Sequence, residues 1–144
     1  QKGDTMALHG EVNYLAVLLC GVIAILIGSF WYSPFIFGKI WMESMDKSED
    51  ELKKDFKPFK TYGLTFICHL VMAFGLAQIM TYLDAYSIPQ GIRVAFLCWV
   101  GFIVAPMLIN TLFEGKKIKL LGVDTGYHLI VMLVFGTILG AWPA

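Results

Sequence analysis

The stretch YLAVLLCGVIAILIGSFWYSPFIFGKIW, residues 14–41, decides the fold class. Its first part, residues 14–30, has no charged side chain. With the flanking aromatic residues it approaches the roughly 20 residues that a helix needs to cross a hydrocarbon core of about 30 Å. The run stops at Pro34 and continues as an aromatic-rich segment with a single lysine, Lys39. A transmembrane helix followed by a segment that lies along the membrane surface explains both parts.

The whole chain has the composition of a membrane protein. Of its 144 residues, 58% are hydrophobic and 15% are charged, with a mean hydropathy of +0.69, whereas soluble domains carry about 25% charged residues. Three more apolar runs follow the first, so we predict an all-α, polytopic integral membrane protein with four transmembrane helices. We place them at about 13–33, 60–83, 92–113 and 121–142, as an antiparallel up-down bundle in a single domain over 13–144.

A cleaved signal peptide is the competing interpretation of the first run. The run ends in bulky aromatic residues instead of a small-residue cleavage site, and three similar runs follow, which favours a membrane span. Residues 1–5 precede Met6, and we expect them to be a tag remnant or a processed end.

The distribution of charge predicts the orientation. The net charge is zero, which argues against a nucleic-acid partner. Nine of the eleven Lys and Arg residues lie in or beside the loops after the first and third helices. The positive-inside rule therefore predicts a cytoplasmic loop over 34–59, a cytoplasmic third loop, and both termini outside, with residues 1–12 as an external tail.

The segment after the first helix is expected to form short helices at the membrane surface. Ser33 followed by Pro34 is typical of a helix start, and we expect Trp31, Tyr32, Pro34 and Trp41 to anchor the chain at headgroup level. The alternative is that Pro34 only kinks a longer transmembrane helix. Further along, Ser48 and Glu51 have the spacing of a capping box, and Glu49 and Lys53 that of a helical ion pair.

Small residues and cysteines add little that is specific. Gly136 and Gly140 have the spacing that lets membrane helices approach closely, either within the chain or in a dimer. We expect Pro89 and Gly91 to break the chain in the short turn between the second and third helices. The three cysteines all lie inside apolar runs, which argues against a disulfide framework.

Polar side chains inside the predicted spans form the candidate site, because a charged group there costs about 2.5–3.5 kcal/mol on insertion scales. Under the predicted topology these groups gather in the cytoplasmic half of the membrane. The cluster consists of His69, Asn110, Glu114, Asp124 and His128.

Three interpretations of this cluster stay open. It can be a structural hydrogen-bond network, a site for a proton, an ion or a small solute, or a metal site for hydrolysis. The H-E-x-x-H and C-x-x-C spacings of metal sites are missing, as are nucleotide and nucleophile-elbow motifs. We therefore assign no catalytic residues, no metal and no cofactor.

Several motifs resemble those of a family of small, mainly bacterial, four-helix membrane proteins, the domain of unknown function 1761. They are WYSPFIFGKIW after the first helix, HLVMAFGLA in the second, NTLFEGK at the end of the third and GYHLIVMLVFGTILGAW in the fourth. The resemblance covers about residues 13–142. It implies the four-helix architecture and a bacterial inner-membrane setting, and it supplies no catalytic residues.

The favoured function is a non-enzymatic membrane component. Its partners would be the lipid bilayer and either further copies of itself or the subunits of a larger membrane complex. A small oligomeric channel or carrier for protons, ions or a small solute is the alternative, and a metal-dependent membrane enzyme is the second alternative.

Overall fold

The computed structural model describes residues 11–54 and 56–144, and within these ranges the chain is helical without β-strands. The predicted external tail over 1–12 falls mostly outside the described residues. The elements are α1 (Tyr14–Trp31), α2 (Gly38–Met45), α3 (Glu49–Lys54), α4 (Pro58–Tyr82), α5 (Ile88–Cys98), the π-helix η1 (Trp99–Val104), α6 (Ala105–Glu114) and α7 (Ile118–Ala141).

Four of the helical rods are long and apolar enough to cross a membrane. They are α1, α4, the continuous rod α5–η1–α6, and α7, with 18, 25, 27 and 24 residues respectively. At 1.5 Å per residue, even the shortest is about 27 Å long, close to the thickness of a hydrocarbon core. The all-helical class is confirmed for the described residues, and four helices there are long and apolar enough to span a membrane, as predicted.

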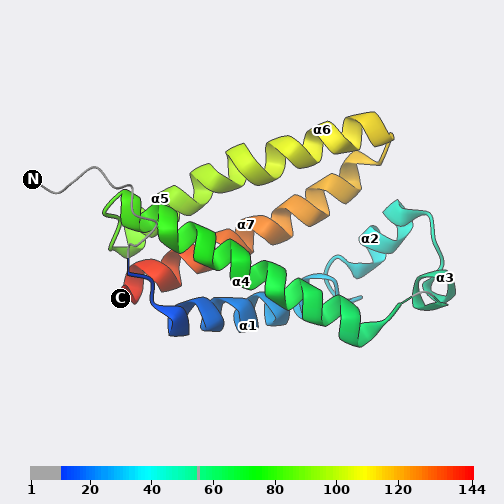
Figure 1. The fold of residues 1–144 in the computed structure, drawn as a ribbon. Coiled ribbons are helices and arrows are strands. Elements are labelled where there is room, and N and C mark those ends of the chain that lie inside the picture. The colour runs from blue at the N-terminus through cyan, green and yellow to red at the C-terminus, as the bar shows by residue number, and fades with distance from the viewer. Residues whose placement is uncertain (1–10, 55) are drawn as a thin grey trace, which may run out of the picture.

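The ends of the rods fall into two groups (Figure 1). The start of α1, the end of α7 and the link between α4 and α5 lie at one end of the molecule, whereas α2, α3 and the link between α6 and α7 lie at the other. Asn13 joins the first group, because its side chain caps α1 through the amides of Leu15 and Ala16 and donates to the carbonyl of Trp142 at 3.1 Å. We refer to the second group, which carries most of the lysines, as the lysine-bearing end.

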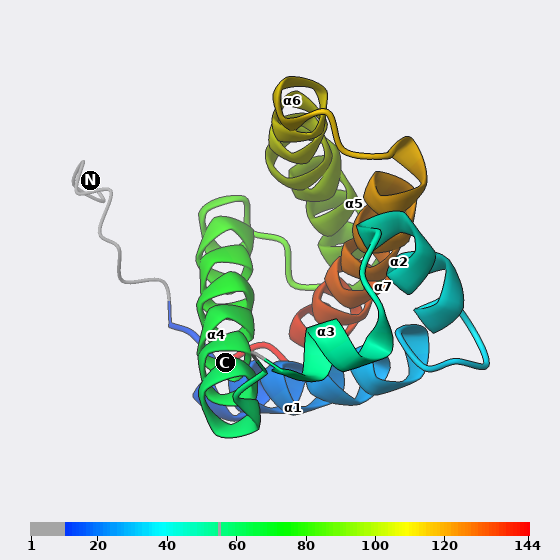
Figure 2. The same cartoon turned by 90° about the vertical axis from the view of Figure 1, so that its right-hand side faces the viewer.

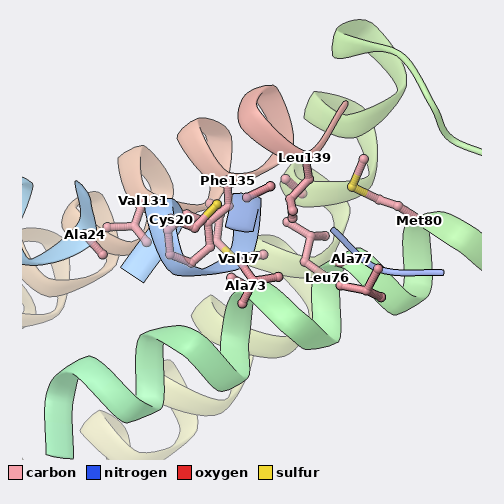
Figure 3. Close-up of a cluster of buried hydrophobic side chains, with 14 of the residues drawn as sticks. Val17, Cys20, Ala24, Ala73, Leu76, Ala77, Met80, Val131, Phe135 and Leu139 are labelled. Atoms are coloured by element: carbon pink, nitrogen blue, oxygen red, sulfur yellow. The ribbon is translucent and has the colours of Figure 1, made fainter. Parts of the chain in front are cut away.

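The core lies where α1, α4 and α7 meet (Figure 3). Small residues of α1 and α4, including Ala16, Ala24 and Ala73, are fully buried and leave room for Phe135 of α7, the largest fully buried side chain among the described residues. The third span takes a smaller part in this core. It packs mainly on α7, and it diverges from α4 (Figure 2).

Close packing of α5 on α7 depends on glycine. A Cβ atom on Gly136 would overlap the backbone of Gly91, and one on Gly140 would overlap the carbonyl of Ser87. The face of α7 that carries Gly136 and Gly140 is therefore occupied by α5 of the same chain. The helices approach backbone to backbone, as small-residue stripes allow in lipid.

Two predicted helix starts are wrong. The helix expected at Pro34 begins at Gly38, because Ser33 donates its hydroxyl back to the carbonyl of Phe30 at 2.7 Å instead of capping a new helix, and residues 33–37 form turns. Pro89 and Gly91, expected to break the chain, lie inside α5. The helix starts at Ile88 with Ser87 as its N-cap, and a proline in the first turn lacks only an N–H that has no helical partner.

The π-helix in the third span follows from Pro106. Proline has no N–H to donate to the carbonyl four residues earlier, so the α-helical ladder cannot continue through this point. Instead the amide of Ala105 donates to the carbonyl of Val100, five residues earlier. The resulting π-helix widens the middle of this span, and such segments are frequent at functional sites.

Candidate buried polar site

A chain of hydrogen bonds joins α1, α4 and α7 in the interior. His69 on α4 is 3% exposed, and its Nδ1 lies 2.9 Å from the carbonyl oxygen of Thr65, one turn earlier. Its Nε2 lies 3.2 Å from the hydroxyl of Tyr127 on α7. That hydroxyl is also 2.8 Å from the carbonyl oxygen of Ala24 on α1. These hydrogen bonds run from Thr65 through His69 and Tyr127 to Ala24 and connect three of the four long helices. We refer to this series of hydrogen bonds as the buried chain.

A second set of bonds connects the end of α1 to the start of α7. Tyr32 donates to a carboxylate oxygen of Asp124 at 2.6 Å, and Trp31 donates its indole N–H to the carbonyl of Val123 at 2.9 Å. The ring of Tyr32 meets that of Tyr127 edge-on, with centroids 5.4 Å apart, so the two sets touch. Burial first, and then the neighbouring Asp124 carboxylate, raises the pKa of the Tyr32 phenol above its ordinary value, which keeps the hydroxyl a donor.

The predicted cluster is divided between these sets and the protein surface. The rings of His69 and His128 both lie near the Tyr127 ring, with centroids 6.0 Å and 5.2 Å from it. Asp124 binds Tyr32. Glu114 is exposed at the end of α6 and forms an ion pair with Lys116 at 2.8 Å, where it takes no part in the buried chain. Asn110 is also exposed, on α6.

The predicted interfacial anchors lie around the end of α1. Trp31 and Tyr32 are partly buried against α7, and the ring of Trp41 on α2 meets Tyr32 edge-on at 5.9 Å. Pro34 lies in the turns that connect α1 to α2. Lys117, in the link before α7, binds Asp46 at 2.7 Å and so ties the end of α2 to the same region.

A cavity of about 300 Å³ lies between α1, α4 and Tyr127 of α7. Its lining includes two members of the buried chain, Thr65 and Tyr127, and its far wall includes Phe56 at the lysine-bearing end. Six of its nine lining residues carry hydroxyl groups: Ser29, Tyr32, Thr61, Tyr62, Thr65 and Tyr127. We refer to it as the hydroxyl cavity.

A larger groove of about 510 Å³ lies between α4 and the third span, with α7 at its base. Its lining is mostly apolar, with His128 and Asn110 as the polar members. The Nδ1 atom of His128 is buried and has no hydrogen-bond partner among the described residues. We refer to it as the α4–α6 groove.

The part of the chain that the structure describes has no set of side chains suited to bind a metal ion. Within residues 11–54 and 56–144, no three His, Cys, Asp or Glu side chains lie close enough to hold an ion. The cysteines of this part are free thiols, with Cys20 buried in the core and Cys68 exposed on α4.

Sequence reasoning chose the titratable residues and passed over their partners. Tyr127 links His69 to Ala24 in the buried chain. It was not among the predicted site residues, because tyrosine in a membrane helix is commonly an interfacial residue. The available signal was its position, three residues after Asp124 and next to His128. Thr65 gave no signal, because its contribution is a backbone carbonyl.

The comparisons with known proteins concern the family only. A family model described as "protein of unknown function (DUF1761)" matches residues 15–140. No curated protein and no solved structure matches the chain.

Proposed function

The chain belongs to the family of proteins of unknown function DUF1761, and we propose that it is a non-enzymatic membrane component that associates with further copies of itself. In this proposal the four spans cross a bacterial inner membrane with the lysine-bearing end in the cytoplasm and both termini outside. The third span provides the contact surface. The polar groups hold the spans of each copy together.

The observation that carries the proposal is how little of the third span the chain itself covers. Only 6% of its most apolar window is buried, against 28%, 33% and 39% for the other three spans. A helix that its own chain leaves open must be covered by lipid or by another protein. Its π-helix and the α4–α6 groove make this surface irregular, so a second copy has a shaped apolar groove into which side chains can pack.

The buried polar groups support a structural role. Bonds from Tyr127, Tyr32 and Trp31 each cross from one span to another. Trp99 adds a fourth, donating to the carbonyl of Thr125 at 2.9 Å. Such bonds between membrane helices contribute on average about 0.6 kcal/mol each, so together they stabilise one arrangement of the four spans.

The test fills the α4–α6 groove without disturbing the single chain. Gly75 lines the groove, and a Cβ atom there meets nothing within 4 Å. Gly63, on the same helix but away from the groove, is equally open. Gly75→Leu and Gly63→Leu are therefore a matched pair, and the measurement is single-molecule counting of subunits in native-membrane particles over a range of expression levels.

We expect the wild type and G63L to form the same small oligomer, and G75L to shift toward monomer. A wild type that is monomeric at every expression level would refute the proposal. So would a G75L protein with the same subunit count as G63L.

A carrier for protons, ions or a small solute is the second candidate, and the hydroxyl cavity is the observation that favours it. A cavity with six hydroxyl-bearing residues in its lining, reaching from the lysine-bearing end to the buried Tyr127, is more than helix packing requires. Liposomes containing a pH dye would compare the wild type with His69→Ala and His128→Ala. A proton flux that either substitution removes would favour this candidate, and its absence in all three proteins would remove it.

A further inference from the structure

The buried chain contains three contacts that need a hydrogen. The carbonyl oxygens of Thr65 and Ala24 can only accept, so the contact with Thr65 needs a proton on Nδ1 of His69 and the contact with Ala24 needs the hydroxyl hydrogen of Tyr127. The remaining contact, between Nε2 of His69 and Tyr127 Oη at 3.2 Å, then has no hydrogen as long as the imidazole is neutral. Two protons are present for three contacts.

We propose that His69 and Tyr127 form a binding site for one proton. The added proton joins the lone pair of Nε2 without breaking any bond in the protein. The imidazolium then donates through Nδ1 to Thr65 and through Nε2 to Tyr127, while Tyr127 donates to Ala24. Each of the three contacts then has its hydrogen, which no neutral arrangement of these groups achieves.

The hydroxyl cavity provides the route for the proton. It touches both Thr65 and Tyr127, and its volume of about 300 Å³ is many times the 10–15 Å³ that one water needs. The hydroxyls of Tyr32 and Tyr127 already donate to Asp124 and Ala24. The lining also has hydroxyl groups on Thr61, Tyr62 and Thr65, which can donate to waters and accept from them. Its far wall at Phe56 and Thr61 lies at the start of α4, so the site exchanges protons with the lysine-bearing end.

The surrounding charges are compatible with one added positive charge. Helix α1 and its cap offer Cys20 and Tyr32, and α7 offers Tyr127, His128 and Asp124, of which Asp124 is the one acid. Asp124 is linked to the site through Tyr32, whose ring touches Tyr127. The sequence has no Lys or Arg at 14–38, 61–92 or 120–144, so no permanent positive charge opposes the proton from within these stretches.

This inference goes beyond the proposed association, because it assigns a ligand to the buried chain. A proton bound at His69 fixes the Tyr127 hydroxyl toward Ala24 and locks α1, α4 and α7 together. When the proton leaves, the Tyr127 hydroxyl can donate either to Ala24 or to His69, but not to both. The contact between two of the three spans is then weakened.

The chain has three histidines, so replacing the other two leaves His69 as the single imidazole. H9Q/H128Q is prepared with ¹⁵N-labelled histidine in lipid nanodiscs, and NMR follows its two ring nitrogens as the pH is lowered. The variants for comparison are H9Q/H128Q/Y127F and H9Q/H128Q/Y82F. Tyr82 is an exposed tyrosine on the helix that carries His69, so it controls for the loss of a phenol hydroxyl.

We expect the Nδ1–H tautomer at high pH and its conversion to imidazolium on acidification. Y127F should move the midpoint to lower pH by roughly one to two units, the shift that corresponds to one lost hydrogen bond to a charged group. Y82F should not move it. An Nε2–H tautomer at high pH, a neutral ring throughout the folded range, or equal midpoints for Y127F and Y82F would overturn the proposal.

A second measurement decides the matter if Y127F does not fold. Proton uptake after an acid pulse is measured with a pH dye for H9Q/H128Q and for H9Q/H128Q/H69Q. Uptake of one more proton per chain by the first protein supports the site, and equal uptake by both refutes it.

Discussion

The backbone contact between α5 and α7 gives a prediction with a defined sign. Replacing Gly136 by alanine places a Cβ atom on the backbone of Gly91, and 3.0 Å from the Cβ of Ala95. The three nearest atoms are the carbonyl oxygen and carbon of Gly91, which belong to the main chain, and the Cβ of Ala95, which is fixed to it, so no side chain can rotate away. The two helices must separate by several tenths of an ångström, which loosens the tightest contact of the third span.

Gly122→Ala supplies the matched control, since Gly122 lies on the same helix and a Cβ there meets nothing within 4 Å. Both substitutions gain the same helix propensity, up to about 1 kcal/mol, so this contribution cancels in their difference. Overpacking at Gly136 costs about 1–3 kcal/mol. We therefore expect G136A to be less stable than G122A by about 1–3 kcal/mol.

The assay is reversible unfolding in mixed micelles with increasing denaturing detergent, followed by tryptophan fluorescence. G91A should lose stability in the same way, because its Cβ would overlap the carbonyl of Gly136, and the double variant G91A/G136A should lose less than the sum of the two. Equal stability of G136A and G122A would refute the described packing of α5 on α7.

Three further predictions concern the lysine-bearing end. Tyr32→Phe removes the bond to Asp124 and should cost about 1–3 kcal/mol in the same unfolding assay, with Tyr14→Phe, an exposed site on α1, unchanged. Lys117→Ala should leave global stability unchanged and speed hydrogen exchange of residues 38–45, because the exposed pair with Asp46 ties α2 down; unchanged exchange would contradict this. The hydrogen bond from Lys53 lowers the pKa of the Glu49 carboxyl below its ordinary value. The ion pair therefore stabilises α3 slightly at pH values above the ordinary pKa, and this stabilisation is lost as the pH falls through the lowered pKa. The protection of the amides of residues 49–54, relative to their intrinsic exchange rates, should therefore fall in acid in the wild type, whereas Lys53→Ala should show a smaller fall.

The spans were predictable because their signal is large and local. Each needs only a long apolar run with few charged residues, and the structure has four helices long and apolar enough to cross a membrane. Local capping was equally accessible, since Ser48 accepts from the amide of Glu51 at 3.2 Å and Glu49 pairs with Lys53 at 2.8 Å, as their spacing predicts. These features depend on neighbours within one helical turn.

Features that depend on tertiary contacts were not accessible. Gly91 indicated a turn in the sequence, but it lies inside α5 because α7 needs a residue without a side chain there. Ser33 has the pattern of a helix cap, yet it bonds backward to Phe30. The candidate cluster shared one depth in the membrane, and depth alone could not separate Asp124, which faces α1, from Glu114, which faces outward.

The central claim, that these four helices cross a lipid bilayer, is tested most directly by the accessibility of engineered cysteines. In a C20A/C68A/C98A background, S48C and S87C each introduce a thiol, one beside α3 and one before α5, at opposite ends of the molecule. In sealed cells, a membrane-impermeant maleimide should label S87C directly and S48C only after permeabilisation. Equal labelling of both in sealed cells, or release of the protein from membranes by alkaline carbonate, would contradict the claim.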